Sequence, residues 1–385
     1  MKLHLSDEVI RSRWTADNAK QRRRLTAALC VFLAAFVFCI CFRYNAYYYD
    51  NKFALPSNLK SYVLAIRMLF SRIVGGRLYV HKAEVIDSFG SVEYYGALAR
   101  LRITAVAFVS GAGLAVSGAI FQSAYRNPMA SPNIIGATAG VNLGNVLVVS
   151  MFSALAYQNI LLRYQYCYGF TAICVGLVLL LGRIASSRNK NASLMEVVMA
   201  GSVISQAFRV FAMYLMYELP EEDLLLYEEI SLGTYPDTSL VSMLIFFGVM
   251  AVALIPVLVM RYRLNCLSMT GAESATLGIR SGGMRLIAQI CGVLMVTCSM
   301  IHCGEIGMIS LVIPYILRQK GFADFRYLCV FSAIIGGALV MICNLVASLI
   351  YIAGTPLPTT FIIEILLMPA FMIILAKTRG NPHEF

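Results

Sequence analysis

Four ionisable side chains stand inside or at the edge of long apolar runs, where a charge is costly unless it has a partner or water. They are Glu196, Arg209, Glu305 and Glu364. Carboxylates and a guanidinium in such places can contact a polar solute, so all four are candidates for lining a pathway across a membrane. For Glu196 and Glu305 the alternative is equally good, because both could simply lie at helix ends in water.

The chain lacks the residues with which it could hydrolyse a nucleotide itself. No G-x-x-x-x-G-K-[ST] phosphate loop occurs in the 385 residues. The 11 Cys lie mostly in apolar stretches without paired C-x-x-C spacing, which indicates small buried residues and neither a disulfide framework nor a metal site. His302 beside Cys303 could suggest a metal ligand, but a histidine at a helix end is the better interpretation. We therefore predict no enzyme, no cofactor and no metal site.

The elements that must position these residues are predicted to be transmembrane helices. Hydrophobic residues make up 59% of the sequence and charged residues 13%, whereas a soluble domain carries about 25% charged residues. Apolar stretches of about 18 residues or more recur along the chain, and each could cross a hydrocarbon core of about 30 Å. The net charge of +11 could suggest nucleic acid, but with this hydropathy it indicates basic cytoplasmic loops.

We predict an all-α polytopic membrane protein with about ten transmembrane helices. Their approximate limits are 25–43, 100–124, 135–155, 165–183, 195–217, 238–260, 286–303, 305–319, 327–352 and 358–376. No A-x-A cleavage site follows the first apolar run, so the first helix is predicted to be retained as a span. In the second helix, Gly111, Gly113, Ser117 and Gly118 are predicted to let helix backbones approach closely.

Loop charges predict the orientation. With the Arg-rich segment 1–24 in the cytoplasm, every short inner loop carries Lys or Arg, as the positive-inside rule expects. The stretch 210–260 contains no Lys or Arg and is rich in Glu and Asp at its middle, so this middle is predicted to lie outside. The transmembrane domain then covers 25–376, with a long outer connection at 44–98 and a cytoplasmic tail at 377–385. Both termini are expected in the cytoplasm of a prokaryote.

A long cytoplasmic loop at 264–285 differs from its neighbours in composition. Its sequence LNCLSMTGAESATLGIRSGGMR contains apolar residues such as Leu267 and Leu277, which need cover, and Gly271 and Gly278 bracket a short helical stretch. Two short helices lying against another protein would fit this pattern. On the segment alone, a surface loop tucked under its own bundle is an equally good interpretation.

Three stretches together match one known family. The first stretch is the loop, where Gly271, Glu273, Ala275 and Gly278 match the pattern LGEExAxxLG. The second covers residues 110–140, which read SGAGLAVSGAIFQSAYRNPMASPNIIGATAG and match GAALAxSGAxxQxxxRNPLAxPxxLGxxxG. The third covers residues 304–328, which read GEIGMISLVIPYILRQKGFADFRYL and match GxIGFVGLxxPHxxRxxxGxDHRxLLP. From about residue 95 to its end, the chain resembles the FecCD-type permeases, the membrane subunits of ABC importers of ferric siderophores, haem and cobalamin.

This resemblance implies a type II ABC importer permease architecture and a set of partners. The 264–285 loop, with Gly271, Glu273, Ala275 and Gly278, would seat on separate ATP-hydrolysing subunits, and the Asn127–Pro128 turn would lie near them. Two permease subunits, identical or different, would form the pathway with their fifth and tenth helices, which makes Arg209 and Glu364 the better pathway candidates. The other expected partners are membrane lipid and an extracytoplasmic substrate-binding protein, and nucleic acid is not expected.

The binding-protein contact and the cargo are less closely defined by the resemblance. Arginines of relatives pair with carboxylates of an extracytoplasmic substrate-binding protein, and Arg100 and Arg102 stand at the same place. The family's RLPR reads Arg100-Leu101-Arg102-Ile103 here, without the proline. The alternative function is an ion-coupled secondary transporter, which would show paired carboxylates or interrupted helices at the membrane midplane.

Overall fold

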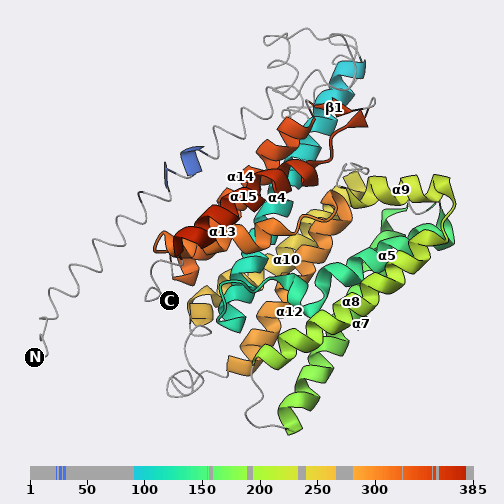
Figure 1. Cartoon of the computed structure of the whole chain (residues 1–385). Coiled ribbons are helices and arrows are strands. Elements are labelled where there is room, and N and C mark those ends of the chain that lie inside the picture. The colour runs from blue at the N-terminus through green and yellow to red at the C-terminus, as the bar shows by residue number, and fades with distance from the viewer. Residues whose placement is uncertain are drawn as a thin grey trace, which may run out of the picture.

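The computed structural model describes most of the chain from residue 91 onward (Figure 1). The described residues are 91–153, 155, 159–188, 194–232, 240–265, 281–322, 324–348, 350–352 and 355–378, with a few positions between 23 and 31. This part is almost entirely helical. Within it, the strands are one antiparallel pair of two residues each, β1 (Tyr351–Ile352) and β2 (Thr355–Pro356). The all-α prediction is confirmed for these residues.

The helices follow one another in the predicted order. They are α4 (Ser91–Tyr125), α5 (Ala137–Phe152), α7 (Ile160–Arg188), α8 (Leu194–Tyr217), α9 (Glu221–Ser231), α10 (Leu240–Leu264), α12 (Ser281–Cys303), α13 (Met308–Gln319), α14 (Phe325–Ala347) and α15 (Thr359–Thr378), with the 3-10 helix η1 (Pro132–Ile135) before α5. Each predicted helix from 100–124 onward has a counterpart among them. The predicted span 25–43 lies mostly outside the described residues.

Several predicted boundaries differ from the structure, and one helix was not predicted. Helix α4 begins nine residues before the predicted start, at Ser91, because residues 91–99 hold no proline and continue the helical run. Helix α14 ends at Ala347 and not at 352, because Tyr351 and Ile352 pair with Pro356 and Thr355. The acidic loop that is predicted to lie outside contains an additional helix, α9, which starts after Pro220. Its first turn holds three acidic residues, whose negative charges interact favourably with the positive end of the helix dipole.

Five described helices are long and apolar enough to cross a membrane. These segments are Leu101–Tyr125, Ile160–Gly182, Val241–Leu264, Gly282–Cys303 and Phe325–Ala347. Shorter apolar helices cover Ala137–Phe152, Met308–Gln319 and Thr359–Ile374. The most apolar window of α12 is 78% buried but that of α10 only 22%, so α12 lies in the core and α10 at the edge of the bundle.

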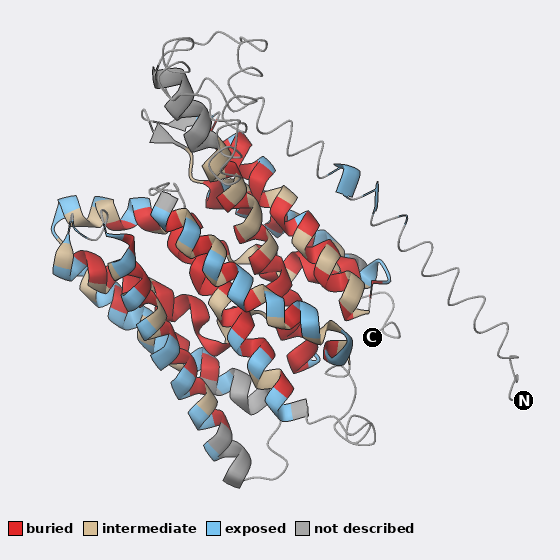
Figure 2. Cartoon of the chain, turned by 180° about the vertical axis from the view of Figure 1, so that it is seen from behind, coloured by how far each residue is buried: buried red, intermediate tan, exposed pale blue. Residues whose placement is uncertain are grey.

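The helices form two groups that meet on the central helices. In Figure 1, α4, α13, α14 and α15 lie on one side, α5, α7 and α8 on the other, and α10 and α12 between them, while α9 lies across one end. Figure 2 shows the buried positions gathered inside this arrangement and the exposed positions on its outward faces. Most of the buried apolar residues belong to one continuous core cluster.

The predicted close packing of the second span is confirmed. A Cβ atom on Gly336 of α14 would lie 2.6 Å from the Gly111 carbonyl oxygen of α4. One on Gly118 would lie 1.6 Å from the carbonyl oxygen of Ser310 in α13. Helix α4 is therefore held backbone to backbone against both α13 and α14, as small residues allow in a membrane.

Candidate functional site

The polypeptide breaks sharply between α12 and α13. Helix α12 ends at Cys303, and Gly304 takes a φ of 71°, a left-handed conformation that glycine adopts at little cost. Glu305 follows, and α13 starts at Met308. With 12 residues α13 is about 18 Å long, too short to cross a hydrocarbon core of about 30 Å.

Glu305 connects three elements at this break. Asn142 of α5 donates a hydrogen bond from Nδ2 to Glu305 Oε2 at 2.8 Å. The Glu305 backbone N–H donates to the carbonyl oxygen of Ser231, the last residue of α9, at 3.1 Å. Thr360 of α15 donates to the carbonyl oxygen of Leu232 at 3.1 Å. The acidic helix α9 is thus fixed at its C-terminal end to the α12–α13 break and to α15.

A second carboxylate lies near this junction. Glu364 of α15 is close enough to Glu305 for the two groups to interact electrostatically. The starts of the two short helices also lie near one another, because a Cβ on Gly307 would be 3.8 Å from Asn133 Nδ2 in η1. Polar groups of α5, α9 and α15 therefore gather around the break, and we call this group, after the predicted orientation of the chain, the outer junction (Asn142, Ser231, Glu305, Thr360 and Glu364).

The other predicted site residues lie on α4, α8 and α15. Arg209 is an exposed side chain of α8, and Glu364 of the outer junction is an exposed side chain of α15, both on largely apolar helices. Glu196 and Arg100 belong to α8 and α4, but their side chains lie outside the described residues. Arg102 is half-buried in α4.

The Asn127–Pro128 turn is held by hydrogen bonds to the side chain and the backbone of Asn127. Asn127 Oδ1 accepts a hydrogen bond from the Met129 N–H at 2.9 Å, and the Ala130 N–H donates to the Asn127 carbonyl oxygen at 3.0 Å. Pro128 suits the second position of such a turn because its φ is already fixed. The turn leaves Asn127 and Met129 exposed.

Arg318 fixes the end of α4 that leads into this turn. Its Nε donates to Gln122 Oε1 at 3.3 Å and a terminal nitrogen donates to Ser123 Oγ at 2.6 Å. Gln122 Nε2 in turn donates to the Leu311 carbonyl oxygen at 2.9 Å. Four of the predicted ATPase-coupling residues, Gly271, Glu273, Ala275 and Gly278, lie outside the described residues; their loop leaves α10 at Asn265 and rejoins the described chain at Ser281.

The sequence did not reveal the partners of these residues. Asn142, Thr360, Gln122 and Asn265 are single amides or hydroxyls in apolar or mixed surroundings, and they carry no motif that pairs them with residues far along the chain. His302 is a buried residue near the end of α12, with Nε2 2.8 Å from Tyr164 Oη. Among the described residues, no group of three or more His, Cys, Asp or Glu could hold a metal ion.

This bundle of membrane-crossing helices, interrupted at a polar junction, is that of a multi-pass membrane transport protein. The family model described as the FecCD transport family matches residues 63–377, and the chain belongs to this family. It is a membrane permease of the ABC importer class, and the alternative of an ion-coupled transporter is not favoured, although short interrupted helices do occur in the structure.

Individual relatives agree with this assignment. An iron chelatin transport system permease protein of Helicobacter pylori is 30% identical over 288 residues, covering 73% of this chain and 82% of its own. The molybdate import system permease protein MolB of Haemophilus influenzae is 26% identical over 287 residues, covering 74% and 82%. A metal-chelate type ABC transporter in an inward-facing conformation shares the fold, with a TM-score of 0.71 at 21% identity over 92% of this chain and 99% of that one.

Proposed function

We propose that this permease passes an iron chelate, or a related metal chelate such as haem or cobalamin, into the cytoplasm between two permease subunits. The observation that carries the pathway is the pair of charged side chains, Arg209 and Glu364, exposed on α8 and α15. A charge exposed to lipid is costly, so both side chains need an aqueous path or a protein partner. A second permease subunit facing α8 and α15 would supply both.

The energy would come from ATP hydrolysed by separate subunits on the cytoplasmic side. The chain has no phosphate loop, and the 264–285 loop resembles the segment that seats on such subunits. The Asn127–Pro128 turn, with exposed Asn127, is a second candidate contact. Both termini would then lie in the cytoplasm, and Arg100 and Arg102 would face an extracytoplasmic binding protein.

The cargo is proposed from the cargoes for which the relatives are named. The Helicobacter relative is named for an iron chelatin, and the Haemophilus relative for molybdate. An oxyanion such as molybdate is the second candidate, and the exposed Arg209 favours it over a cation.

A reconstitution assay tests this proposal. The genes beside that of the permease are searched for an ATPase and a binding protein, and those found are co-expressed with the permease and reconstituted with it into proteoliposomes. Uptake of 55Fe-labelled ferric siderophore, haemin, 57Co-labelled cyanocobalamin and 99Mo-molybdate is measured with ATP, without ATP and with an imposed proton or sodium gradient. ATP-dependent uptake of a chelate is expected. Uptake driven by the ion gradient alone would overturn the proposal, and ATP-driven uptake of molybdate alone would overturn the chelate assignment.

A further inference from the structure

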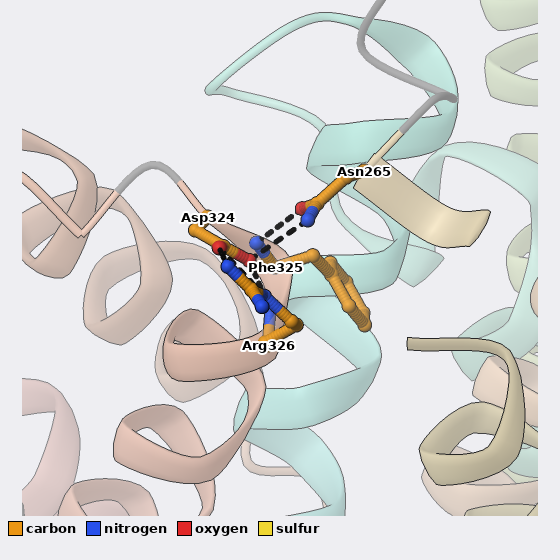
Figure 3. A network of polar contacts seen from close by, with 4 residues as sticks. All are labelled: Asn265, Asp324, Phe325 and Arg326. Carbon is orange, nitrogen blue, oxygen red and sulfur yellow. Dashed lines mark hydrogen bonds and ion pairs between the residues drawn. The ribbon is translucent and has the colours of Figure 1, made fainter. Parts of the chain in front are cut away.

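The end of α10 is tied to the start of α14 by one amide side chain (Figure 3). Asn265 Nδ2 donates to Asp324 Oδ1 at 2.8 Å, and Asn265 Oδ1 accepts from the Phe325 backbone N–H at 2.5 Å. Both hydrogen-bonding ends of the amide are thereby used on a segment about 60 residues further along the chain. We call Asn265, Asp324, Phe325 and Arg326 the α10–α14 clamp.

The α14 side of the clamp is rigid in itself. Asp324 is the N-cap of α14 and accepts from the Arg326 N–H at 2.9 Å, while its Oδ2 accepts from Arg326 Nε at 2.7 Å and pairs with a terminal guanidinium nitrogen. Burial acts to raise the pKa of the Asp324 carboxyl, but the hydrogen bonds from Arg326 and Asn265 outweigh it and hold this pKa below its ordinary value. Phe325 is buried beneath the clamp, so the helix start cannot swing away cheaply.

Arg326 adds a second link between the same two helices. Its guanidinium carbon lies 5.2 Å from the ring centroid of Tyr262 on α10 and 5.6 Å from that of Tyr327 on α14. A guanidinium within about 6 Å of an aromatic ring is attracted to it. The clamp therefore joins α10 to α14 through an amide and through a cation over a ring.

Helix α14 is in turn joined to α4 over its length. Gly111 and Gly336 meet backbone to backbone, and a Cβ on Gly337 would lie 2.7 Å from the Phe108 carbonyl oxygen. A contact this close leaves little room for α14 to slide against α4. Any displacement imposed on the start of α14 is thus carried into a pair of membrane-crossing helices.

We propose that the α10–α14 clamp is the joint through which a displacement of the end of α10 is passed to α14 and α4, with Asn265 and Asp324 as positioning residues for transport. This proposal rests on the proposed function, in which ATPase subunits act on the loop that follows Asn265. Asn265 carries the hydrogen-bonded part of the link: its removal leaves the Asp324 cap, the Asp324–Arg326 pair and the contact of Arg326 with Tyr262 intact. The permease then keeps its fold, but the connection between α10 and α14 is weakened.

The test uses the full complex in proteoliposomes and measures ATP hydrolysis and uptake of whichever of the four probes the wild type accumulates. Asn265→Ala is expected to retain ATP hydrolysis and to raise the ATP hydrolysed per molecule transported by about 2- to 30-fold. Asn265→Asp is expected to be more severe, because it places a second carboxylate beside Asp324. The paired exchange of Asn265→Asp with Asp324→Asn restores an amide opposite a carboxylate and is expected to recover part of the coupling.

Lys320→Ala is the matched control, since Lys320 is an exposed cation of the same α13–α14 turn that takes no part in the clamp. Its ratio of ATP to transported probe should stay at the wild-type value. An unchanged ratio in Asn265→Ala would overturn the inference. So would a parallel fall of hydrolysis, uptake and thermal stability, because that is the signature of a purely structural contact. If the wild type shows no ATP-dependent uptake, the proposed function fails first and this inference falls with it.

Discussion

The α10–α14 clamp and the outer junction are two polar groups that join helices distant in sequence, but they are held by different forces. The clamp contains an ion pair, a capped helix start and charge-assisted hydrogen bonds. The outer junction has a neutral amide on a carboxylate, and neither Glu305 nor Glu364 has a cationic partner among the described residues. Both groups contain an amide that donates to a carboxylate, but the clamp adds an ion pair between a guanidinium and that carboxylate.

This difference indicates where the permease can change shape at least cost. The outer junction is held chiefly by the hydrogen bond from Asn142 to Glu305 and by backbone hydrogen bonds, and Glu364 adds a second negative charge near Glu305. The clamp and the α4–α14 contact form a stiff unit in comparison. We therefore expect the α4–α14 unit to move as one body and the outer junction to rearrange around it.

The largest effect is expected where α4, a helix of the stiff unit, is pushed sterically away from its other close neighbour, α13. Gly118→Leu must push α4 away from the Ser310 backbone of α13, which should cost about 3 kcal/mol or more of folding free energy. Size-exclusion profiles and thermal unfolding of the detergent-solubilised protein measure it. Gly176→Leu on α7 is the control, because nothing lies within 4 Å of a Cβ there. Equal unfolding temperatures for both variants would show that the α4–α13 contact is not stiff.

The next effect concerns transport and not folding. Glu273→Arg, and separately Gly278 replaced by a bulky residue, are expected to lower ATP-driven uptake by about tenfold or more while membrane insertion stays intact. The reason is that both residues lie in the loop that resembles the ATPase-docking segment. Uptake and the amount of inserted protein are measured in the same vesicles. Normal uptake in both variants would remove the loop from the proposed mechanism.

A smaller effect is expected from removing the helix cap in the clamp. Asp324→Ala should cost about 1 to 2 kcal/mol at neutral pH, because α14 loses its N-cap and Arg326 loses its partner. The folded-state pKa of Asp324 is depressed, so its stabilisation is complete above its ordinary pKa of about 3.9 and is lost as the pH falls through the folded-state value. The gap in unfolding temperature between wild type and variant should thus be present at pH 7 and shrink below pH about 4. A gap that does not change with pH would contradict the charged form of the clamp.

Much of the bundle could be predicted from the sequence, because apolar length and loop charge are local properties. The family and the order of helices followed from them and from three motifs. The additional helix α9 was missed, because its acidic residues indicated a loop although they favour a helix start after Pro220. The link from Asn265 to Asp324 could not be predicted, since nothing local pairs an amide with a carboxylate 59 residues away. Asp324 by itself is a local signal of a capped helix start, because Asp is a favoured N-cap residue.

The smallest effect is expected at the outer junction, and it decides whether the comparison holds. Glu305→Gln keeps an oxygen that accepts from Asn142 and removes the repulsion with Glu364, so stability at pH 7 should change by no more than about 0.5 kcal/mol. Glu305→Ala, which removes the acceptor, should cost about 1 kcal/mol. Thermal unfolding of both variants is the measurement. A loss in Glu305→Gln as large as that in Glu305→Ala would mean that the negative charge itself stabilises this end of the bundle, because both variants remove the charge and only the first keeps the acceptor. The outer junction would then be an electrostatic anchor like the clamp, and the part of the permease that rearranges would have to be sought on α8 and α15.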